Sequence, residues 1–95
     1  MFNEENLFFN FKKIVDRIVA RLREGNNQFL LTYTNNIDND WAIQANSFLH
    51  RYTEYCSAIG TQIDVAEDGA HYGIQSHSLW AERLYDKWIE LYGKE

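Results

Sequence analysis

The sequence predicts a two-layer α+β domain in the element order αβαββα, with a three-stranded mixed sheet and helices mainly on one face. Three observations support this prediction. Apolar residues recur with a helical period in residues 3–24, 40–59 and 77–92. Residues 28–34 alternate β-forming side chains, and an Asp-Gly pair between two short apolar stretches indicates a hairpin.

The first helix is expected over residues 3–24, with Asn3 as its N-cap and Gly25 as the residue that follows its C-terminus. Positions four and then three residues apart share one side of a helix, so a regular apolar stripe marks the buried side. That stripe consists of Leu7, Phe11, Ile14, Ile18 and Leu22.

A strand over residues 28–34 and a second helix over residues 40–59 are expected next. In the strand, one face is apolar and the other is mixed, because Phe29, Leu31 and Tyr33 alternate with Leu30, Thr32 and Thr34. The second helix ends at Gly60. Its buried stripe is predicted to contain Trp41, Ala45, Phe48, Tyr52, Tyr55 and Ile59.

The Asp68-Gly69 pair predicts a two-residue type I′ turn, because both central positions of that turn need positive φ and tolerate these residue types. The resulting register runs from Ala66 opposite His71, through Val65 opposite Tyr72, to Gln62 opposite Gln75. One face of this hairpin is then apolar and packed under helices, while the other face is wet.

The last helix is expected over residues 77–92, capped by Ser76 or Ser78 and ended by Gly93. Trp80, Leu84, Trp88 and Leu91 are expected to point inward. A β-α-β connection through the second helix predicts a parallel strand pair with a right-handed crossover, to which the hairpin adds an antiparallel strand. Residues 1–95 are expected to form one domain.

The composition limits the class of protein. The chain has 95 residues, 16% aromatic residues and a formal net charge of −5. Direct nucleic-acid binding is not expected, because displacing counterions from phosphates requires a basic surface. A single cysteine cannot form an internal disulfide, which favours a reducing, cytoplasmic location. Neither a signal peptide nor a membrane span is expected, and Cys56 is expected to be a small buried apolar residue.

Two charged stripes of opposite sign are the most informative feature. Like charges four residues apart on a helix repel each other, so each stripe is expected to face opposite charge. That opposite charge belongs to the other stripe, to a second copy of the chain or to a different protein. The basic stripe is Lys13, Arg17 and Arg21, and the acidic stripe is Glu82, Asp86 and Glu90.

These features favour a small acidic, non-catalytic interaction protein. Its most concrete form is a stoichiometric inhibitor or adaptor that binds a basic, nucleic-acid-processing protein, and a homodimer is also consistent with the stripes. Tyrosine beside acidic residues is typical of contact surfaces. The expected partner-binding residues are Glu82, Tyr85, Asp86, Glu90 and Tyr92.

Two alternatives remain open. A small anionic ligand, such as a nucleotide, would suit the N-terminus of the last helix, although helix capping by serine explains the same residues. The residues expected to bind it are Asp64, His71, Gly73, Ser76, His77 and Ser78. A small enzyme is the third possibility, with His50 and Glu54 at i, i+4 spacing or His77 as its acid-base group. No metal or cofactor is expected. Residues 36–40 resemble a calcium loop, but this interpretation is rejected because Trp41 stands where the loop needs a glycine.

Overall fold

The computed structural model describes residues 4–33 and 40–93. The elements are α1 (Glu4–Glu24), β1 (Leu31–Tyr33), α2 (Asp40–Leu49), β2 (Tyr55–Ser57) and α3 (Ile74–Tyr92). The α+β class is confirmed. The predicted three-stranded mixed sheet and the order αβαββα are wrong within the described part of the chain, which forms one parallel pair, β1 and β2, in the order αβαβα. The Asn3 cap and most of the calcium-like segment lie outside the described residues.

The first helix ends at Glu24, as predicted, but the left-handed residue that follows it is Asn26 and not Gly25. Gly25 still donates its N–H to the carbonyl of Arg21 at 3.2 Å, and the left-handed residue is Asn26, with φ of 56°. Asparagine tolerates this conformation better than other residues that have a Cβ atom. The side chain of Asn27 then donates to the carbonyl of Leu22 at 3.2 Å and satisfies part of the exposed helix end.

The predicted helix over residues 40–59 is wrong after Leu49. Arg51 and Tyr52 make hydrogen bonds to carbonyls three residues earlier, at 3.2 and 3.1 Å, which tightens and ends the helix. The chain then extends into β2. Tyr55 and Cys56, which also fitted the apolar stripe of a helix, are instead buried in the strand β2.

The parallel relation predicted for the β-α-β unit is confirmed, although its second strand is Tyr55–Ser57 and not the segment before the turn. The predicted burial of Cys56 is also confirmed, and burial raises the pKa of its thiol. The N–H of Leu31 donates to the carbonyl of Glu54 at 2.9 Å, just before β2. The paired residues are Leu31 with Tyr55, Thr32 with Cys56, and Tyr33 with Ser57.

The core lies between α1, α2 and the strand pair. Its buried centre is Val19, Leu49, Tyr52 and Tyr55. Half-buried aromatic rings surround it, and Trp41 receives the edges of Phe8 and Phe11 at centroid distances of 5.1 and 5.4 Å. The fully buried apolar positions of the described residues include three alanines, so this core is small.

The predicted hairpin is reduced to one antiparallel bridge. The bridge joins Val65 to Tyr72, as the predicted register required. The turn differs, because only Gly69 has a positive φ, of 75°, and its N–H bonds to the carbonyl of Ala66 at 2.9 Å. Pairing ends there because Ile74 already belongs to α3. The expected apolar face is not covered: Ile63, Val65 and Ile74 are exposed.

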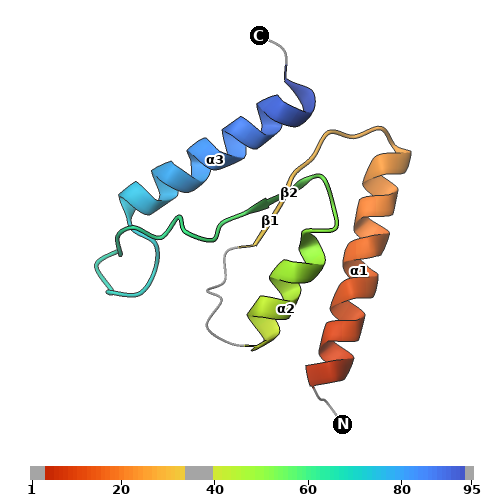
Figure 1. Cartoon of the computed structure of the whole chain (residues 1–95), viewed down its shortest axis with the longest axis horizontal. Helices are drawn as coiled ribbons and strands as arrows, with labels where there is room; N and C mark the ends of the chain where they lie inside the picture. Colours follow the sequence, from red (N-terminus) through yellow and green to blue (C-terminus); the bar gives the residue numbers. More distant parts are fainter. Residues whose placement is uncertain (1–3, 34–39, 94–95) are drawn as a thin grey trace.

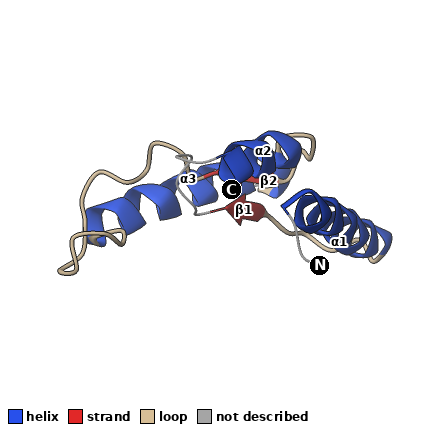
Figure 2. Cartoon of the chain, turned by 90° about the horizontal axis from the view of Figure 1, so that it is seen from below, coloured by secondary structure: helices blue, strands red, loops and turns tan. Residues whose placement is uncertain are grey.

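Helices α1 and α3 flank the strand pair from opposite sides, and the molecule is flat (Figures 1 and 2). Its principal extents are 43 × 36 × 17 Å. Trp80 on α3 donates its indole N–H to the hydroxyl of Thr32 on β1 at 3.0 Å, which fixes α3 to the sheet. Trp41, Trp80 and Trp88 are half-buried rather than enclosed as predicted. None of the helices described here has the length and apolar content needed to cross a membrane.

Candidate interaction surfaces

The two charged stripes do not meet within the chain. All six side chains are exposed, and α1 and α3 lie on opposite sides of the strands (Figure 1). The ion pairs formed by the described residues include none between the stripes. Pairing of the stripes within one chain, one of the three expectations, is therefore not the arrangement of this fold.

The acidic face of α3 is formed by Glu82, Tyr85, Asp86 and Glu90. Tyr85 is 57% exposed, as its predicted role as a contact residue requires. Glu90 lies 3.5 Å from the ammonium of Lys87, whose side chain is the more buried of the two. The outer side of the helix thus keeps a negative charge, and a solvent-facing aromatic ring lies beside it.

Tyr92 does not belong to this face. Its hydroxyl donates to the carbonyl of Phe29 at 2.8 Å and accepts the N–H of the same residue at 3.2 Å. Its ring packs against Trp88 with a centroid distance of 4.7 Å. Tyr92 therefore fastens the end of α3 to the segment before β1, and it is half-buried and not exposed as predicted.

Three residues of the α1 apolar stripe that was expected in the core lie at the surface. Leu7, Ile14 and Ile18 are 40%, 55% and 49% exposed. Each residue turns a helix by about 100°, so these three share one line, and Val19 lies about 100° further round, where it is buried. The apolar arc of α1 is too wide for the one short helix α2 to cover, and the width of this arc was the sign in the sequence that part of it would be exposed.

Arginines border this stripe. Arg17 and Arg21 line a shallow groove on the helix together with Ile18 and Leu22. We define the basic-apolar face of α1 as Leu7, Ile14, Arg17, Ile18 and Arg21. It combines exposed aliphatic side chains with positive charge, although the apolar stripe and the basic stripe were predicted as two separate features.

The N-terminus of α3 is capped by a carboxylate of the protein itself. Asp64 accepts the N–H groups of Gln75 and Ser76 at 3.0 and 2.8 Å. These bonds, with that of the Ser76 hydroxyl as the largest cause, lower the pKa of Asp64. An anionic ligand at these N–H groups would have to displace Asp64, so two of the residues predicted to hold a ligand, Asp64 and Ser76, are already engaged with each other.

Ser76 is fully buried and does not cap the helix as predicted, because α3 begins at Ile74 and the N-cap is Gly73. Its hydroxyl accepts the N–H groups of Ile63 and Asp64 at 2.8 and 2.9 Å. A Cβ atom on Gly73 would lie 2.5 Å from the Asp64 carboxyl carbon. The glycine is thus required for the close approach of this carboxylate. Ser78, the other predicted cap, is exposed.

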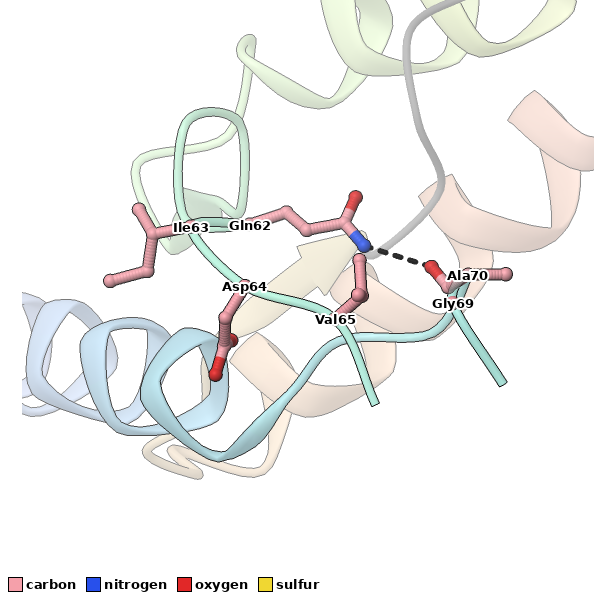
Figure 3. A pocket seen from close by; sticks show the side chains of 6 residues that line it. All are labelled: Gln62, Ile63, Asp64, Val65, Gly69 and Ala70. Carbon is pink, nitrogen blue, oxygen red and sulfur yellow. Dashed lines mark hydrogen bonds between the residues drawn. The ribbon is translucent and has the colours of Figure 1, made fainter. Parts of the chain in front are cut away.

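The remaining residues of the predicted ligand site lie nearby. His71 is exposed and is bound through Nδ1 to Asp68, a bond that raises its pKa. His77 packs beside the Tyr72 ring at 5.8 Å. Figure 3 shows the adjoining open pocket, in which Gln62 reaches across to the carbonyl of Ala70 at 2.9 Å, and Asp64 points toward α3.

The His50 and Glu54 pair loses the helical spacing on which its prediction depended, because α2 ends at Leu49. Both carboxylate oxygens of Glu54 instead accept from Arg23 of α1, at 2.7 and 3.1 Å, and this bond lowers the pKa of Glu54. His50 meets the ring of Tyr55 edge-on at 5.0 Å. Glu54 therefore serves to attach α1 to the start of β2.

Within residues 4–33 and 40–93, His, Cys, Asp and Glu side chains form no group of three that could hold a metal ion. No protein-family model, curated protein or solved structure matches the chain.

Proposed function

We propose that this chain is a non-catalytic interaction protein that binds a basic protein surface through the acidic face of α3. The observation that carries the proposal is the exposure of this face on a helix that two side chains fix to the rest of the fold. Trp80 and Tyr92 hold α3 in place through Thr32 and Phe29. The acidic face is thereby presented on a rigid element, which reduces the entropy lost on binding.

The charge of the molecule supports this proposal. A net charge of −5 steers an acidic domain toward a basic partner and increases the rate of association. Tyrosine contributes contact area at a low cost in side-chain entropy. A foreign protein, as for an inhibitor or adaptor, and a second copy of this chain are both partners of the required kind.

The titratable groups of the alternative sites have structural roles that also support a non-catalytic protein. Glu54 binds Arg23, Asp64 caps α3, and His71 closes the turn with Asp68. The first two bonds join distant segments of the fold, and the third stabilises a local turn.

Native mass spectrometry of the protein, purified gently from its own source, tests the proposal. We expect the wild-type chain to carry a second polypeptide, and Asp86→Lys to lose it, because the substitution reverses the charge at the centre of the acidic face. Glu67→Lys is the matched control, since Glu67 is an exposed acidic residue in the distant turn before Gly69.

Binding of a polypeptide that persists in Asp86→Lys would contradict the proposal, as would a wild-type chain that carries no polypeptide. An added mass of a few hundred daltons, lost in Ser76→Ala, would instead favour the small-ligand alternative.

A further inference from the structure

We propose that the partner of the acidic face is a second copy of this chain, whose α1 docks its basic-apolar face there. This inference rests on the proposed function and names the partner of the same face. The α1 helix of one copy lies against α3 of the other, so that Arg17 and Arg21 meet Glu82 and Asp86 while the exposed isoleucines of α1 are covered.

The surface of the isolated chain is too large for a compact monomer. Its accessible area is 6927 Å². This exceeds by roughly 1,200 Å² the value of about 5,700 Å² that a compact monomer of 11.3 kDa exposes. Its radius of gyration, 15.1 Å, likewise exceeds the value of about 12 to 13 Å for a domain of this length. A standard interface buries about 800 Å² on each partner, so the excess is enough for a stable dimer.

Charge selects the helix that covers α1. Two α1 helices packed along Ile14 and Ile18 would place Arg17 and Arg21 beside the same arginines of the other copy. Like charges across an interface cost several kcal/mol and disfavour that pairing. The acidic face of α3 has the opposite sign, and within one chain it cannot reach α1, which lies on the other side of the strands (Figure 1).

The two faces have matching patterns. On α1, Ile14 and Ile18 are four residues apart, and Arg17 and Arg21 repeat that spacing about 60° to one side. The α3 helix places Tyr85 and Ile89 in the same way beside Glu82 and Asp86, about 60° to the other side. Because the two rotations are opposite, α1 of one copy and α3 of the other can run parallel with their apolar pairs in contact and their charged pairs in contact.

Charge exchange tests this interface. Sedimentation equilibrium should show a wild-type dimer, which weakens as salt screens the charges. Arg17→Glu/Arg21→Glu and Glu82→Lys/Asp86→Lys should each raise the dimer dissociation constant about 100-fold or more, because each makes the contact like-charged. A one-to-one mixture of the two variants should dimerise again, since every α1 to α3 contact in the mixed dimer joins opposite charges.

The controls separate folding from association. Circular dichroism of each variant should match the wild type, since all four side chains are exposed. Arg17→Gln/Arg21→Gln gives a milder change in case the reversal perturbs α1. Glu67→Lys should dimerise like the wild type.

Three outcomes would overturn the inference. They are a monomeric wild type, a dimer that neither double variant weakens, and a mixture that fails to recover association. A monomeric wild type that binds a foreign basic protein, and loses it in Glu82→Lys/Asp86→Lys but not in Arg17→Glu/Arg21→Glu, would leave the proposed function standing while the second copy is rejected.

Discussion

Ser76 shows how one small side chain can hold several segments together. Its buried hydroxyl bonds to the backbone of residues 63 and 64 and to the carboxylate of Asp64, which in turn caps α3. The loop before α3 thus has polar anchors where it has few buried apolar side chains. Ser78, two residues on, faces solvent.

Ser76→Ala should lower the free energy of unfolding by about 1 to 3 kcal/mol, because two backbone N–H groups lose their buried acceptor. Urea unfolding of the variant and the wild type measures the difference. Ser78→Ala is the control and should stay within about 0.5 kcal/mol of the wild type. Equal effects of the two substitutions would contradict the anchoring role of Ser76.

His71 should titrate above its ordinary pKa of 6.5 in the folded protein, because Asp68 binds the protonated ring. A raised pKa means that this bond contributes its full stability below pH 6.5. The contribution is lost as the pH rises through the folded-state value. A titration followed by NMR at the imidazole protons should show that Asp68→Asn returns the His71 pKa toward 6.5. An unchanged value in the variant would exclude Asp68 as the cause.

At the scale of elements, helix α1 depends on a left-handed residue after its last turn. Asn26→Ala should cost about 1 kcal/mol, because a residue other than glycine or asparagine is strained at a φ of 56°. Asn26→Gly should be close to neutral. Thermal or urea unfolding provides the comparison. Gly25→Ala should cost less than Asn26→Ala, since its added Cβ meets only the movable amide of Asn27, at 2.7 Å. The reverse order would place the left-handed residue at Gly25.

The pair formed by Arg23 and Glu54 attaches α1 to β2. A double-mutant cycle with Arg23→Ala and Glu54→Ala should give a coupling of about 1 kcal/mol, reduced by solvent because the Arg23 side chain is half exposed. The lowered pKa of Glu54 means that the coupling is complete above 4.5 and is lost as the pH falls through the folded-state value.

Arg21→Ala with Glu54→Ala is the control cycle for this pair, because Arg21 faces solvent elsewhere on α1. Its coupling should be close to zero. A comparable coupling in both cycles would indicate a general charge effect rather than the specific bond between α1 and β2.

For the whole molecule, the proposed dimer predicts that stability depends on association, because the core is small and the exposed surface is large. Species that bind only the folded state raise its apparent stability in proportion to the logarithm of their concentration. The wild-type melting temperature should therefore rise with protein concentration, whereas that of Glu82→Lys/Asp86→Lys should not. Differential scanning calorimetry over a range of concentrations measures this. A wild-type melting temperature that is independent of concentration would contradict a folded dimer.

Periodicity found α1 and α3 because each contains an apolar arc over many turns, and it found the register of Val65 with Tyr72 because an Asp-Gly turn fixes which residues face each other. It failed at residues 50–59, where Tyr52 and Tyr55 fit a helical stripe and a short strand equally well. The apolar residues of α1 were assigned to the core because a pattern gives the width of an apolar arc but not how much of it another element covers.

The class of the fold, the parallel relation within a β-α-β unit, the two opposite charged stripes and the burial of Cys56 were all predictable from the amino-acid sequence. They follow from side-chain spacing and residue type, which are local properties. The pairing of residues 55–57 with β1, the capping of α3 by Asp64 and the separation of the stripes emerged only in the folded chain. Each of these depends on contacts between distant segments, whose energies exceed the small local preferences that a sequence pattern records.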